Sequence, residues 1–91
     1  MKVIKNKEIQ IKDKKSSFGD LLKACINAPD QNGFTIEDIE KRLRILKGIG
    51  EKEIKLEDAD HNTAVEVINK MRWFAIDQNI IDFRNAFLNK E

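Results

Sequence analysis

The residue types that most often carry catalysis are scarce in this chain of 91 residues, which has one cysteine, one histidine and no tyrosine. A thiolate beside an imidazole can act as a nucleophile. Cys25, however, falls on an apolar stripe with Leu21 and Leu22, where a cysteine usually behaves as a small buried hydrophobe. His61 lies beside an expected helix start and is interpreted as a surface residue, and two such ligands far apart in sequence do not make a zinc site. We therefore expect no catalytic residue, no metal and no cofactor, and the protein is not predicted to be an enzyme.

The stretch "DADHN", residues 58–62, has the spacing with which a calcium-binding EF-hand loop begins, because alternate oxygen ligands converge there on one ion. The rest of such a loop does not follow. Its sixth position needs a glycine and holds Thr63, and its twelfth needs a glutamate and holds Asn69. Asp58 and Asp60 are instead expected to cap a helix.

The stretch "LKGIGEKEIKL", residues 46–56, resembles the hairpin of the helix-hairpin-helix family, in which a glycine, a hydrophobic residue and a second glycine make a turn between two helices. The resemblance implies that backbone N–H groups of this turn bind a DNA phosphate, with Gly48, Gly50 and Lys52 as the contacts. Ile49 would be the hydrophobic residue between the glycines. The same residues also fit an ordinary helix stop, in which Gly48 or Gly50 takes a left-handed angle.

Composition narrows the class of protein further. Hydrophobic residues make up 41% of the chain and charged residues 36%, which is typical of a globular fold. The net charge of +1 lacks the excess of lysine and arginine that general nucleic-acid binding needs. The charges are unevenly distributed along the chain, because residues 1–15 are basic and residues 51–69 are acidic. The many lysines, isoleucines and asparagines are typical of an AT-rich coding sequence and indicate a bacterial or phage source.

The sequence also indicates a location. The longest apolar run, residues 73–76, has four residues, whereas a membrane-spanning helix needs about 20. The lysine-rich start is not a secretory signal, because its apolar residues never form a continuous stretch. A single cysteine cannot form an internal disulfide and fits a reducing compartment. The expected location is the cytoplasm.

Hydrophobic periodicity predicts one small α+β domain over residues 1–91. Residues 1–15 should form a basic strand or hairpin, with Asn6 between its two apolar runs, and four helices are expected over residues 17–28, 35–48, 58–76 and 79–90. Ser17 and Thr35 have the spacing of helix caps. The "EIKLE" stretch, residues 53–57, can add a strand, giving a two- or three-stranded antiparallel sheet; if it is helical, the protein is all-α.

The tail of the chain gathers the only tryptophan and three of the five phenylalanines. Phe74, Phe83 and Phe87 can close the core. Trp73 points away from the apolar stripe and is expected to be partly exposed, at a surface that another protein covers. Two terminal helices with such wide apolar faces have more apolar surface than a core of this size can bury. We therefore predict a protein-protein interaction module of the assembly, adaptor or inhibitor type, binding a partner or itself as a homodimer. The predicted contact residues are Trp73, Phe74, Ile80, Phe83, Arg84 and Phe87. The alternative is a small DNA-contacting protein.

Overall fold

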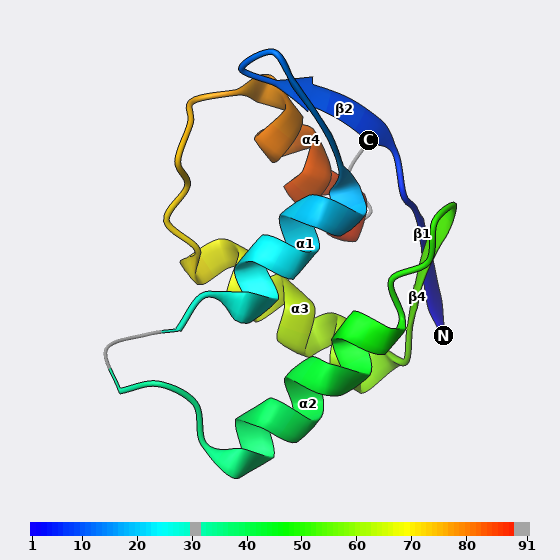
Figure 1. The fold of residues 1–91 in the computed structure, drawn as a ribbon. Coiled ribbons are helices and arrows are strands. Elements are labelled where there is room, and N and C mark those ends of the chain that lie inside the picture. Colours follow the sequence, from blue (N-terminus) through cyan, green and yellow to red (C-terminus); the bar gives the residue numbers. More distant parts are fainter. Residues whose placement is uncertain (30–31, 89–91) are drawn as a thin grey trace.

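The computed structural model describes residues 1–29 and 32–88, and within them the chain forms four helices and two small antiparallel sheets of two strands each (Figure 1). The α+β prediction is confirmed and the all-α alternative is wrong. The elements in order are β1 (Lys2–Lys5), β2 (Glu8–Ile11), β3 (Lys14–Ser17), α1 (Phe18–Asn27), α2 (Ile36–Lys47), β4 (Glu53–Leu56), α3 (Asp58–Lys70) and α4 (Gln78–Phe87).

The first sheet joins segments that are far apart in sequence. β1 pairs antiparallel with β4 in a register that places Lys2 opposite Leu56 and Lys5 opposite Glu53. The N-terminal amine lies 3.4 Å from the carboxylate of Asp58, just beyond β4. The pairing predicted between the N-terminal strand and the "EIKLE" stretch is confirmed, and the basic start of the chain lies against the acidic segment.

The second sheet is the β2–β3 hairpin, and it turns later than the sequence indicates. Lys12 and Asp13 form the two-residue turn with φ angles of 49° and 65°. Positive φ at both positions is the geometry that matches the twist of paired strands. The turn expected at Asn6 is wrong, because Asn6 lies between β1 and β2 and its side chain bonds to other segments.

Two of the predicted helix caps are confirmed. The hydroxyl oxygens of Ser17 and Thr35 accept from the N–H groups of the residues three positions on, each at 3.1 Å. The caps expected from Asp58 and Asp60 are wrong. α3 begins after Glu57 with no side-chain cap, and both aspartates lie in its first turn, where a carboxylate suits the positive end of the helix.

α3 ends at Lys70 rather than at the predicted residue 76, because Met71 leaves helical geometry with ψ of 136°. The next residues, 72–76, are not helical. In their non-helical path the ring of Trp73 reaches Phe83 edge-on at 5.9 Å. α4 then starts after Asp77, whose carboxylate accepts from the N–H of Asn79 at 2.8 Å. It ends at Phe87, and the last residues of the predicted helix, 89–90, lie outside the described residues.

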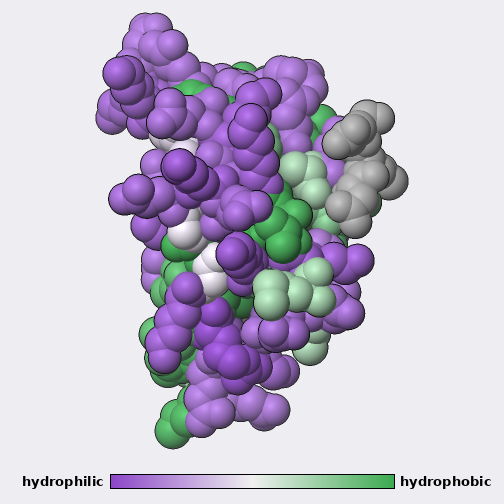
Figure 2. Space-filling view, turned by 90° about the vertical axis from the view of Figure 1, so that its right-hand side faces the viewer, coloured by the Kyte–Doolittle hydropathy of each residue, from purple (hydrophilic) through white to green (hydrophobic). Residues whose placement is uncertain are grey.

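The core is built mainly by α1, α3, α4 and one face of each sheet. In Figure 1, α2 runs along the lower edge of the molecule and the segment between α3 and α4 runs along the left edge. Figure 2 views the side that carries β1 and β4, which is mostly hydrophilic, with apolar residues along its lower-left edge and a second group near its centre. The fully buried residues of greatest volume are Phe83, Phe87, Leu22, Ile26, Ile45, Ile54 and Cys25.

Candidate functional site

The turn at Gly48–Gly50 uses its backbone N–H groups within the chain. Gly48 donates to the carbonyl oxygen of Ile45 at 3.0 Å, Ile49 to that of Leu46 at 3.2 Å, and Gly50 to that of Glu53 at 2.9 Å. Donors occupied in this way are not free for a phosphate. The second helix that the helix-hairpin-helix resemblance implies is missing, because residues 53–56 form β4. Lys52 is exposed, and its carbonyl oxygen accepts from the N–H of Asn6 at 2.9 Å.

The glycines of this turn have a steric role. Neither has a positive φ, so the expected left-handed angle is wrong. A Cβ on Gly48 would lie 2.3 Å from the carbonyl oxygen of Lys55, and one on Gly50 would lie 2.9 Å from that of Glu53. The end of α2 can therefore approach β4 only where side chains are missing, and the residues conform to a helix stop that also packs against a strand.

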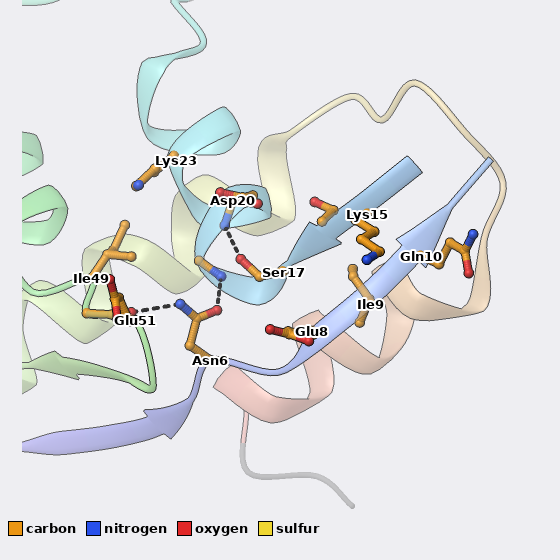
Figure 3. Close-up of a pocket in the computed structure, with 13 residues that line it drawn as sticks. Asn6, Glu8, Ile9, Gln10, Lys15, Ser17, Asp20, Lys23, Ile49 and Glu51 are labelled. Atoms are coloured by element: carbon orange, nitrogen blue, oxygen red, sulfur yellow. Dashed lines mark hydrogen bonds between the residues drawn. The ribbon is translucent and has the colours of Figure 1, made fainter. Parts of the chain in front are cut away.

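A groove of about 840 Å³ lies between this turn, the β2–β3 hairpin and the start of α1 (Figure 3). Asn6 sits at its base. Its amide nitrogen donates to the carbonyl oxygen of Gly50 at 2.7 Å, and its amide oxygen accepts from the N–H of Gly19 at 2.7 Å. The charged residues that line the groove are of both signs: Glu8, Lys15, Asp20, Lys23 and Glu51. The lining includes neither Cys25 nor His61.

Cys25 is fully buried in α1, as its apolar stripe predicts. Burial raises the pKa of its thiol to about 12. The thiolate is the reactive form of cysteine, so this thiol is poorly suited to nucleophilic chemistry near neutral pH.

His61 is 8% exposed, and the prediction that it lies on the surface is wrong. Its Nε2–H donates to the carbonyl oxygen of Phe87 at 2.7 Å, because a carbonyl oxygen can only accept. Its ring stacks on that of Phe87, with centroids 6.0 Å apart. His61 therefore joins α3 to the end of α4. A sequence signal was present, because His61 precedes Ala64 and Ile68 by three and seven residues on one helix face.

The aspartates of the "DADHN" stretch are each paired with a cation. Asp60 is 7% exposed, and its carboxylate oxygens lie 3.3 and 3.4 Å from Nε of Arg44. Asp58 faces the N-terminal amine. Among the residues described by the structure, no three histidine, cysteine or acidic side chains gather in a way that could hold a metal ion.

The structure divides the predicted partner-binding residues. Ile80, Phe83 and Phe87 are 7%, 0% and 0% exposed and lie in the core, where they present no surface. Phe83 contacts Phe18 and Phe87 edge-on, with ring centroids 5.6 and 5.1 Å apart. Arg84 is half-buried and donates to the side-chain oxygen of Asn85.

The remaining two predicted residues lie at the surface. Trp73 is half-buried, with its ring 5.9 Å from that of Phe83 and 6.4 Å from that of Phe74. Phe74 is 60% exposed, so its expected place in the core is wrong. Ile76, which sequence reasoning did not select, is 107% exposed. We call Trp73, Phe74 and Ile76 the 73–76 surface.

A second apolar surface lies on α2, and it was not predicted from the sequence to be exposed. Ile36, Ile39 and Leu43 are 78%, 42% and 49% exposed, although their spacing predicts a core-facing stripe. α2 instead contacts the core through Ile45, which is fully buried and lies on the opposite face of the helix from Ile36. Periodicity therefore found the stripe, and the choice of which apolar face is covered depended on tertiary packing.

Comparison with known proteins finds no matching family model, no similar curated protein and no similar solved structure. The described part of the chain contains no helix with both the length and the apolar composition needed to cross a membrane. Function must therefore be inferred from this chain's own surfaces.

Proposed function

We propose that this protein is a non-enzymatic interaction module that binds another protein through the 73–76 surface. The observation that carries the proposal is the exposure of Phe74 and Ile76, which are 60% and 107% accessible next to a half-buried tryptophan. We further propose that it works in the cytoplasm of a bacterium, or in a phage-infected one, as an assembly, adaptor or inhibitor protein.

Exposing an aromatic side chain to water is unfavourable in free energy, and a partner that covers the side chain removes this penalty. Aromatic residues supply much of the binding energy at protein interfaces, where they fill pockets from which water is excluded. Single exposed apolar residues are common on protein surfaces, but clusters of large ones mark interaction sites. Phe74 and Ile76 are two positions apart on a short non-helical segment, and most of the surface of each residue is exposed.

Trp73 is the half-buried member of this surface and connects it to the core. Its ring lies edge-on to Phe83, which α4 holds in the core at 0% exposure. A rigid anchor lowers the entropy cost of binding, because fewer rotamers are frozen when the partner docks. The buried residues of the predicted contact set therefore position the surface and do not form it.

The proposal can be tested with a variant that keeps the core and removes the surface. Phe74→Ser/Ile76→Ser changes two exposed side chains, so its free energy of unfolding should stay within about 1 kcal/mol of wild type. Wild type and variant are used as baits in a lysate of the source organism, and bound proteins are compared by quantitative mass spectrometry. Ile36→Gln/Leu43→Gln, on the separate surface of α2, is the matched control.

The proposal predicts at least one protein that is retained by wild type and by the α2 control and lost by Phe74→Ser/Ile76→Ser. It is contradicted if the same proteins bind all three baits equally. It is also contradicted if the Phe74→Ser/Ile76→Ser variant unfolds, because the two side chains would then belong to the core.

A further inference from the structure

α2 carries an apolar stripe with the spacing of a coiled-coil seam. Ile36, Ile39 and Leu43 follow one another at intervals of three and four residues, and Leu46, half-buried against the core, continues the series. Alternating intervals of three and four are the heptad pattern, in which a second helix covers the seam. The stripe lies on α2, which runs along the lower edge of the molecule in Figure 1.

The orientation of α2 is fixed by contacts on its other side, so the stripe cannot turn inward. Ile45 is fully buried in the core. The guanidinium of Arg42 donates to the carbonyl oxygen of Ile26 at 2.8 Å and lies 4.5 Å above the ring of Phe34. Arg44 pairs with Asp60 of α3. These contacts attach the helix to the body of the protein and leave the seam facing outward.

The charges along α2 are divided between its two halves. The first half carries Glu37, Asp38 and Glu40, and the second half carries Lys41, Arg42, Arg44 and Lys47. A helix with this pattern is complementary to a copy of itself running in the opposite direction, because each acidic half then lies beside a basic half. The same pattern disfavours a parallel copy.

We propose that α2 is a homodimerisation helix that docks antiparallel onto α2 of a second copy of this chain about a two-fold axis. In the heptad register, Ile39 faces Leu43 of the second copy and Ile36 faces Leu46 of the second copy. The residues flanking the seam on its solvent side are Glu40 and Lys47, both exposed in the single chain. The antiparallel arrangement brings Glu40 beside Lys47 of the second copy, twice by symmetry. A parallel arrangement brings Arg42 beside Lys47 of the second copy, which repels.

The size of the surface sets the strength of the dimer. α2 has 12 residues and is therefore about 18 Å long, so the contact falls among small interfaces of less than about 1,200 Å² in total. Interfaces of this size support weak, concentration-dependent association. The α2 seam and the 73–76 surface are formed by different parts of the chain, so the dimer can be tested independently of the proposed partner binding.

The test is analytical ultracentrifugation of the full chain at low ionic strength, from about 10 µM to about 1 mM, because salt screens exposed charge pairs. Wild type should shift from monomer toward dimer over this range. Glu40→Lys and Lys47→Glu should each weaken association about tenfold, since each places like charges together at two symmetric contacts. An equal mixture of the two variants should associate more strongly than either alone, because opposite charges then meet at both contacts.

Controls separate this result from unfolding and from general charge effects. Glu66→Lys makes the same charge change on the exposed side of α3 and should leave the dimer unchanged, as should Phe74→Ser/Ile76→Ser. Circular dichroism confirms that each variant is folded. Ile39→Gln should remain monomeric at every concentration.

The proposal is overturned if wild type is a monomer at about 1 mM. It is equally overturned if Lys47→Glu strengthens association, which is the result that a parallel pair gives, or if the mixture of Glu40→Lys and Lys47→Glu associates no better than its components.

Discussion

Cys25 provides a pH-dependent test of the core, because its thiol is buried while the unfolded chain exposes it. Burial raises the pKa from 9.0 to about 12 in the folded protein. The folded state therefore binds this proton more tightly than the unfolded state does. The stabilisation is complete below pH 9 and is lost as the pH rises from 9 toward 12. At pH 10 the unfolded chain gains about 1.4 kcal/mol from ionising Cys25, while the folded protein gains almost nothing.

The measurement is urea unfolding at pH 8 and pH 10, followed by the fluorescence of Trp73, on wild type and Cys25→Ala. The two proteins share every other titrating group, so the difference between their pH responses isolates the thiol. Wild type should lose about 1.4 kcal/mol more than Cys25→Ala between the two pH values. Any folded pKa above about 11 gives the same result at pH 10. Equal losses would show that Cys25 ionises as readily in the folded protein as in the unfolded chain, and would refute its burial.

Three further predictions test the packing. Gly48→Ala should cost about 3 kcal/mol or more in chemical denaturation, because its Cβ would lie 2.3 Å from the carbonyl oxygen of Lys55. Gly33→Ala, at a φ of 72° and with no atom within 4 Å of the new Cβ, should cost only about 1 kcal/mol. The reverse order of the two losses would contradict the packing of the turn on β4. Lys12→Asn/Asp13→Gly should raise stability by about 1 kcal/mol, because both replacements suit positive φ; a loss on thermal unfolding would mean that the hairpin turns elsewhere. Phe83→Ala should cost about 3–5 kcal/mol and Phe74→Ala less than about 1 kcal/mol, and similar losses in urea titrations would place Phe74 in the core.

Local rules predicted the parts of the fold that depend on neighbouring residues. The caps at Ser17 and Thr35 need only a hydroxyl three residues before a backbone N–H, and the spacing is visible in the sequence. Gly48 ends α2 as expected. The strand over residues 53–56 follows from alternation of Ile54 and Leu56, both buried at 0% and 2% exposure.

The errors arose where tertiary contacts decided between two local options. α3 stops at Lys70 because Trp73 reaches Phe83, a contact that periodicity cannot anticipate. His61 was placed on the surface because its partner, the carbonyl oxygen of Phe87, belongs to another helix. The hairpin turns at residues 12–13 rather than at Asn6, whose side chain connects Gly19 to Gly50.

The candidate surfaces were predicted only in part for the same reason. Periodicity identified the apolar residues of α2 and of the tail, but burial depends on how many of them the rest of the chain can cover. The core is filled by Phe83, Phe87 and Ile45. Ile36 and Phe74 remain exposed, and each belongs to one of the two proposed surfaces.

The central claim is that the core is complete without the exposed residues of α2 and the 73–76 surface. The most direct test is the unfolding free energy of one variant, Ile36→Gln/Leu43→Gln/Phe74→Ser/Ile76→Ser, measured at a few micromolar in urea with Trp73 fluorescence. Surface substitutions predict a cooperative transition within about 2 kcal/mol of wild type. A loss of about 6 kcal/mol or more, or the absence of a cooperative transition, would contradict the claim, because such losses are those of buried side chains.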